Sequence, residues 1–195
     1  MHALLPRTTL LAAAMAVGLA ACASTSMPSG SNRPAATPRV AASTVQEATA
    51  NLASASGSLV SGRLTLKPMG DGVHLRGELG GFMPGSSHGF HIHETGDCSA
   101  ADASSAGGHF NPGAQPHGRA GQGPHHAGDA DNLVADARGV AKVDVHVRGL
   151  RLGGGGASDA LGRAVIAHAA ADDYRSQPAG NAGARVACGV VRTVR

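Results

Sequence analysis

Three stretches of the chain alternate between apolar and polar side chains with a period of two. Their apolar positions are Val60, Leu64 and Leu66; Val73, Leu75 and Leu79; and Val143, Val145 and Val147. Successive side chains of a β-strand point to opposite faces, so the alternation predicts antiparallel strands with one buried and one solvated face. His74 and His146 occupy polar positions of these stretches, and we expect them to be solvated residues of the outer face.

Glycine and proline divide these stretches into short pieces. The chain holds 29 glycines, and the runs at 80–81 and 153–156, together with Pro84-Gly85, interrupt the pattern. Such residues mark turns, and no stretch after residue 52 has a sustained helical period. The pattern therefore predicts an all-β sandwich or flattened barrel with long functional loops.

The N-terminal segment, residues 1–21, has the pattern of an export signal. Arg7 precedes an apolar run from Leu10 to Ala21, which at about 12 residues is too short to span a bilayer. The run ends in Leu19-Ala20-Ala21-Cys22, which resembles the bacterial lipobox, in which the Cys is lipidated and becomes the mature N-terminus. The alternative is an ordinary signal peptide in which Cys22 is incidental.

The next segment, residues 22–51, is rich in Ser, Pro, Thr and Ala and has almost no large apolar side chain. Such a composition cannot bury enough surface to fold, which predicts a disordered tether. The globular domain is then expected at residues 52–195. Its two cysteines, Cys98 and Cys188, most simply form one disulfide in an exported protein.

Composition narrows the functional classes. The formal net charge is +3, and the basic residues are scattered singly, so no run of them neutralises consecutive phosphates. The chain has no Trp, one Tyr and three Phe, which excludes an aromatic platform for stacking bases. We therefore expect no nucleic-acid partner. Because aromatic residues also anchor tight interfaces, we expect a monomer or a weak homodimer.

Histidines carry the candidate chemistry. The chain has 11 of them, and most crowd into residues 88–168. His91-Ile92-His93 places two imidazoles on one side of a strand, since alternate side chains share a face. The other positions of interest are His109, His117 and His126 in a long loop poor in apolar residues, Asp129 three residues later, and His168 after an apolar run. A bound metal would hold such a loop together.

Three segments resemble the copper/zinc superoxide dismutase family, and the match runs from about residue 57 to the C-terminus in family order. They are His88-Gly89-Phe90-His91-Ile92-His93-Glu94, Gly107-Gly108-His109-Phe110-Asn111-Pro112, and Gly180-Asn181-Ala182-Gly183-Ala184-Arg185-Val186-Ala187-Cys188-Gly189. The position of Cys98 soon after the first segment is similar to that in the bacterial exported branch. The resemblance implies a Greek-key, immunoglobulin-like β-sandwich or flattened barrel.

The resemblance implies two metal sites, with one copper and one zinc ion in each chain. The copper ligands would be His91, His93, His109 and His168, and the zinc ligands would be His109, His117, His126 and Asp129, with His109 bridging both metals. All-imidazole sites suit copper, whereas three nitrogens and a carboxylate in a closed tetrahedron suit zinc. His125 competes with His126, and only His126 keeps the family spacing His-x-x-Asp.

The resemblance also implies roles beyond the ligands. Asp172 would be the outer carboxylate that links His91 to His117, and Arg185 would be the active-site arginine beside copper. His88 matches a structural histidine that is not a ligand.

Other features of the family are kept or changed in this chain. Cys98 and Cys188 match the family disulfide. Ala130 stands where the family usually has Leu. The segment from Tyr174 to Gly180 is short and carries one charge, Arg175, in place of the charged cluster that steers substrate in the eukaryotic branch.

The implied activity is dismutation of superoxide to molecular oxygen and hydrogen peroxide by redox cycling of copper, as antioxidant defence outside the cytoplasm. The expected location is the bacterial periplasm or cell envelope, with a lipid anchor at Cys22 in a membrane. Two alternatives stay open. One is a copper-binding or delivery domain without catalysis on the same fold, and the other is a zinc lyase or hydrolase that uses the His-x-His strand.

Overall fold

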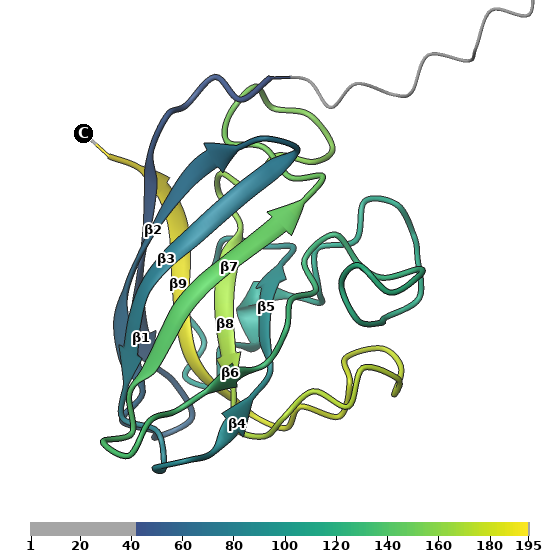
Figure 1. Ribbon diagram of the computed structural model, residues 1–195. Coiled ribbons are helices and arrows are strands. Elements are labelled where there is room, and N and C mark those ends of the chain that lie inside the picture. The colour runs from purple at the N-terminus through teal and green to yellow at the C-terminus, as the bar shows by residue number, and fades with distance from the viewer. Residues whose placement is uncertain (1–41, 195) are drawn as a thin grey trace, which may run out of the picture. The chain divides into compact units, whose positions relative to one another are not determined.

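The computed structural model describes residues 42–194, which form an almost entirely β-stranded domain (Figure 1). Its strands are β1 (Ala48–Ser54), β2 (Ser61–Met69), β3 (Gly72–Gly80), β4 (Ser87–His88), β5 (Phe90–His93), β6 (Leu133–Val134), β7 (Ala141–Arg148), β8 (Ala164–His168) and β9 (Arg185–Thr193). Within residues 42–194 the only helical element is the 3₁₀ turn η1 (Ser104–Ala106), and no helix there could span a bilayer. The predicted signal segment, Cys22 and most of the predicted tether lie outside the described residues.

Seven strands form one antiparallel sheet in the order β5-β8-β9-β1-β2-β3-β7, and β4 and β6 form a two-stranded ribbon. The sheet curls strongly (Figure 1), and the ribbon meets β7 through the bridge between Ala135 and Ala141. Inward-facing side chains from both ends of the sheet share one core, to which Leu64 on β2, Ile92 on β5 and Val165 on β8 belong. The predicted all-β, barrel-like fold is confirmed.

The alternating stretches become β2, β3 and β7, as predicted. Leu64, Leu75 and Val143 are buried, whereas His74 and His146 lie opposite each other on the outer face of β3 and β7. Each of these two histidines contacts a surface carboxylate. The Nε2 atom of His74 lies 2.5 Å from an oxygen of Asp144, and that of His146 lies 2.8 Å from an oxygen of Asp71.

The predicted boundary at residue 52 is wrong, because the ordered domain begins earlier. β1 starts at Ala48 and pairs with both β2 and β9, and Ala48 and Ala50 are fully buried in the core. Before it, the backbone N–H groups of Thr44 and Val45 donate to the carbonyl of Leu152. The inward-facing positions of β1 are filled by small alanines, and the strand is held by its pairing with β2 and β9. Its composition therefore does not differ from that of a disordered tether.

Two long loops, residues 94–132 and 169–184, lie on the same side of the sheet, beside β5 and β8 (Figure 1). The predicted disulfide joins the first loop to the sheet: Cys98 is bonded to Cys188 on β9, with a Cα–Cα distance of 5.8 Å. The chemistry-bearing histidines lie where these loops meet the two strands.

Candidate metal centre

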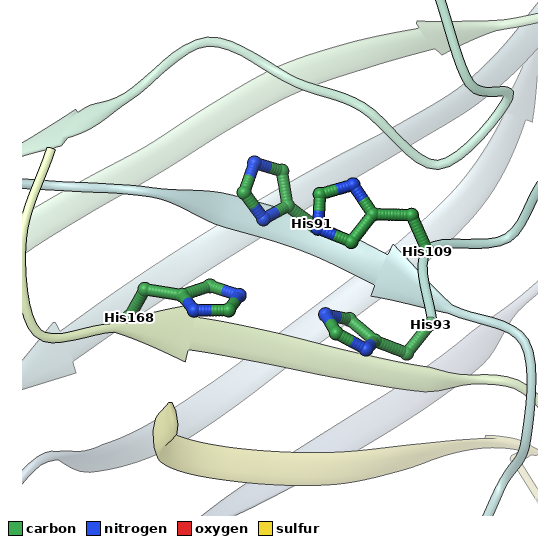
Figure 2. A group of neighbouring side chains, drawn as sticks. All are labelled: His91, His93, His109 and His168. Atoms are coloured by element: carbon green, nitrogen blue, oxygen red, sulfur yellow. The ribbon is translucent and has the colours of Figure 1, made fainter. Parts of the chain in front are cut away.

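Strands β5 and β8 carry three of the buried imidazoles. His91 and His93 lie on β5, and His168 ends β8, where the pairing with β9 shifts register. The first loop then brings His109 to the end of β5 through a bridge with His93. All four side chains are buried, and Figure 2 shows their rings gathered around a common point.

These residues form the first donor set: His91, His93, His109 and His168, which offer nitrogen atoms within 4.8 Å of one another. In each ring one nitrogen has no hydrogen-bond partner. These atoms are Nδ1 of His91 and Nε2 of His93, His109 and His168. Buried polar atoms are normally paired, so four unpaired nitrogens facing one point indicate a ligand site.

The opposite nitrogens of the first set are held by the protein. Nε2 of His91 donates to Asp172 Oδ2 at 2.8 Å, and Nδ1 of His93 donates to the carbonyl of Gly107 at 2.9 Å. Nδ1 of His168 faces the carbonyl of Gly183 at 3.3 Å. A ring nitrogen that donates to an oxygen leaves the other nitrogen with a free lone pair, which is how metal-binding histidines are fixed.

The second donor set is made of His109, His117, His126 and Asp129. The Nδ1 atoms of the three histidines converge on one oxygen, Oδ1 of Asp129, at 2.7, 3.1 and 3.4 Å. The other oxygen of Asp129 accepts the backbone N–H groups of His126 at 2.8 Å and of Gly118 at 3.2 Å. The carboxylate is thereby fixed with one oxygen among three imidazole nitrogens.

His109 belongs to both sets. Its Nδ1 atom faces Asp129 in the second set, and its Nε2 atom is the unpaired nitrogen that faces the first set. One imidazole therefore presents its two nitrogens to two adjacent sites, which is the arrangement of a bridging ligand.

Asp172 joins the two sets from outside. Its Oδ2 atom accepts Nε2 of His91, and its Oδ1 atom accepts Nε2 of His117 at 3.0 Å. Asn132 holds the backbone of Asp172, accepting its N–H and donating to its carbonyl, and the Tyr174 hydroxyl accepts the N–H of Asn132. The predicted role of Asp172 matches these contacts. Asn132 and Tyr174 escaped the sequence analysis because a polar residue in a loop has no spacing that marks it.

Burial controls the charge state of the site. It lowers the pKa of His91 to about 4, against the opposing hydrogen bond with Asp172, and it lowers the pKa of His168 to about 3. It also lowers the pKa of His93. Burial alone would raise the pKa of Asp129, but the hydrogen bond from His109, the nearby His117 and two backbone N–H groups hold that pKa well below its usual range. At neutral pH His91, His93 and His168 are therefore neutral imidazoles, and Asp129 is an ionised carboxylate.

Arg185 lies at the edge of the first set. Its guanidinium donates to the carbonyls of Ala103 and Gly107, both at 2.6 Å. The carbonyl of Gly107 also accepts Nδ1 of His93, so the guanidinium and a first-set imidazole share one acceptor. A hollow of about 250 Å³ adjoins His168 and is lined by residues of the second loop.

Two other histidines take no part in either set. Nδ1 of His125 faces the carbonyl of its neighbour His126 at 2.7 Å, which agrees with the choice of His126 for the second set. Nδ1 of His88 donates to the carbonyl of His168 at 2.8 Å, and its ring stacks on Phe82. His88 thus supports the first set through the backbone, as a structural residue.

The donor chemistry fits copper and zinc. Four imidazole nitrogens suit copper, and three imidazole nitrogens with one carboxylate oxygen suit tetrahedral zinc. The unpaired nitrogens of His117 and His126 face the second set in the way that those of the first set face theirs. The residues present are therefore a matched pair of ligand sets that share His109.

Comparison with known proteins agrees with this geometry. The family described as copper/zinc superoxide dismutase matches residues 60–191. Superoxide dismutase (Cu-Zn) 2 of Aquifex aeolicus is 38% identical over 149 residues, 75% of this chain and 86% of that protein. Superoxide dismutase-like protein YojM of Bacillus subtilis is 40% identical over 124 residues, 62% of this chain and 63% of that protein.

Solved structures show the same fold. The crystal structure of the clock protein EA4 superposes with a TM-score of 0.69 at 36% identity, covering 79% of this chain and 98% of that one. The family match spans most of the described domain, and the relatives' identity lies well above the level at which only a fold is shared. This chain belongs to the copper/zinc superoxide dismutase family.

Proposed function

We propose that this protein dismutates superoxide to molecular oxygen and hydrogen peroxide, with copper in the first donor set and zinc in the second. The observation that carries the proposal is His109, whose two nitrogens face the two sets. Copper held there would supply a one-electron couple that oxidises one superoxide and reduces the next. Zinc would supply a fixed positive charge without redox chemistry.

The chain's own residues bind the substrate and move the proton. The Arg185 guanidinium stays charged, because its ordinary pKa is so high that the lowering caused by burial leaves it protonated at neutral pH. It lies beside His93 through the shared carbonyl of Gly107, where a small anion would approach the first set. Reduced superoxide needs two protons to leave as hydrogen peroxide. Nε2 of His109 would deliver one that it has first taken up from water, and water would supply the other directly.

The main alternative is a copper-binding or delivery domain without catalysis. One relative bears the name superoxide dismutase-like protein, so the fold alone does not decide between the two functions. The complete first set and Arg185 favour the enzyme, since a domain that only stores copper needs neither the guanidinium nor a shared imidazole. A zinc lyase is disfavoured, because it would leave His168 and the bridging position of His109 without a role.

The test is the rate of superoxide decay, measured by pulse radiolysis, with the purified protein loaded with copper and zinc. We expect rapid catalytic decay that is lost in a His168→Ala variant and kept in His74→Ala, a variant of the outer face. A parent protein that holds both metals and leaves superoxide decay at the uncatalysed rate would support the copper-binding domain.

We further propose that the protein is exported and anchored in the cell envelope through Cys22. The disulfide between Cys98 and Cys188 supports export, since such bonds persist in oxidising compartments. A Cys22→Ser variant should release a soluble exported protein with unchanged specific activity. Continued membrane association of that variant would contradict the anchor.

A further inference from the structure

The backbone of His117 is held by a single side chain. The Oε1 atom of Gln177 accepts the N–H of His117 at 2.8 Å, and its Nε2 atom donates to the carbonyl of His117 at 2.9 Å. The carboxamide thus bonds to both polar groups of one residue, as a neighbouring strand does in a sheet. The two residues are 60 positions apart and belong to different loops.

No other hydrogen bond is made to the N–H or the carbonyl of His117 in the part of the chain that the structure describes. His117 lies in the first loop, outside every strand, and within residues 42–194 its N–H and carbonyl have no backbone hydrogen bond. Its ring is fixed through Asp172 and Asp129, whereas the N–H and carbonyl of its own main chain bond to Gln177. The position of the imidazole therefore depends on the segment that carries Gln177.

That segment is closely packed on the site. Gly180 has φ +65°, and a Cβ atom there would lie 1.8 Å from Oδ1 of Asp172 and 2.7 Å from Nε2 of His117. The backbone of the second loop therefore lies directly against the contact between Asp172 and His117. Asp173 braces the same segment by accepting the N–H groups of Arg175 and Ser176.

We propose that Gln177 is a positioning residue for the zinc ligand His117 and that it slows the release of zinc. The inference rests on the proposed function in that zinc occupies the second donor set. Gln177 replaces the backbone partner that His117 lacks in its irregular loop, and it ties the loop of the second set to the loop that borders the first set. Loosening this contact opens the second set while leaving the imidazoles on β5 and β8 in place.

The test compares zinc release from the fully loaded protein into a chromogenic chelator. Gln177→Met keeps the length of the side chain and removes both hydrogen bonds. Gln177→Asn keeps the amide but shortens the side chain, so that the amide no longer reaches the backbone of His117. Residues that orient a metal ligand from outside the ligand shell change metal affinity by about 10–100-fold. Because Gln177 is exposed, we expect the lower end of that range, with both variants releasing zinc about 10-fold faster than the parent. Copper retention should be unchanged.

Gln122→Met is the matched control, since Gln122 is an exposed glutamine of the same first loop, and it should release zinc at the parent's rate. The visible spectrum of cobalt in the zinc site reports ligand geometry directly and should change in both Gln177 variants but not in Gln122→Met. Release at the parent's rate in both Gln177 variants would overturn the inference and leave the proposed function standing. Equal acceleration of copper and zinc loss would also overturn it, because it would indicate general loosening. A parent that binds no zinc would overturn both.

Discussion

The two donor sets share an imidazole and differ in what supports them. Three members of the first set lie on β5 and β8, which are paired with each other at the end of the seven-stranded sheet. All four members of the second set lie between strands, in the first loop. The sheet positions the first set with or without a metal, whereas the second set depends on contacts that cross from other parts of the chain.

The crossing contacts are few and identifiable. The disulfide ties the first loop to β9, Asp172 bonds to His117, and Gln177 holds the main chain of His117. The comparison teaches that a strand pair can present the imidazoles of the first set with little assistance, but that a loop requires covalent and polar supports to present a carboxylate and three imidazoles.

The disulfide should have the largest effect. Cys98 and Cys188 are separated by 90 residues, and the chain-entropy model assigns a loop of that size about 4–5 kcal/mol of stability as an upper estimate. A Cys98→Ser, Cys188→Ser double variant should melt about 8–20 °C below the parent in calorimetry. Hydrogen exchange should rise more in the first loop than in β5 and β8. Uniform exchange across both regions would remove the distinction between the sets.

Asp172→Asn should weaken metal binding by about 10–100-fold, because loss of an orienting partner has that effect without loss of a ligand. His91 is also held by β5, whereas His117 is held in its loop, so zinc affinity should fall further than copper affinity. Competition with a chelator of known affinity measures both values. Asp71→Asn is the control, since Asp71 contacts His146 and Arg148 on the outer face and lies outside both loops. Equal losses of copper and zinc in Asp172→Asn would contradict the asymmetry.

Arg185→Ala should lower the second-order rate of dismutation about 10-fold, within the range of electrostatic steering. The hollow beside His168 is lined by uncharged side chains, including Ser176, Gln177 and Asn181, so Arg185 carries an unusual share of the attraction. Arg185→Glu should lower the rate further, and salt should weaken these differences by screening. Both variants should hold the parent's copper and zinc. If Arg185→Glu dismutates superoxide as fast as the parent protein at low salt, the guanidinium has no role in substrate capture.

His125→Gln should have the smallest effect, although its neighbour is a member of the second set. Among the described residues, the ring of His125 has a hydrogen bond with the carbonyl of His126 alone, so stability should change by no more than about 0.5 kcal/mol. Zinc content should stay that of the parent, whereas His126→Gln should lose it. Metal analysis of the two variants side by side checks the choice between adjacent histidines. Zinc loss in His125→Gln would reverse that choice.

The sequence predicted those features whose residues recur at regular intervals along the chain. Alternating apolar residues marked β2, β3 and β7. The spacing of His and Asp marked the candidate ligands, and the family resemblance divided them into the two donor sets. The sequence misplaced the start of the domain, because Ala48 and Ala50 fill the core with side chains as small as those of a tether.

The hydrogen bonds that hold the ligand residues in place left no regular pattern in the sequence. The backbone carbonyl of Gly107 accepts hydrogen bonds from His93 and Arg185. Gln177 bonds to His117, which is 60 residues away in the sequence. These contacts depend on how two irregular loops meet in space, and no local pattern of side chains encodes that meeting.

The most direct test of the account is native mass spectrometry of the protein during titration with copper and zinc. If the two sets share His109 and differ in support, the parent should bind one copper and one zinc per chain. His109→Ala should weaken both, and His126→Gln should lose zinc while keeping copper. A parent that binds a single metal ion, or a His126→Gln variant that loses copper as readily as zinc, would contradict two adjacent sites of which one is built on strands and the other on a loop.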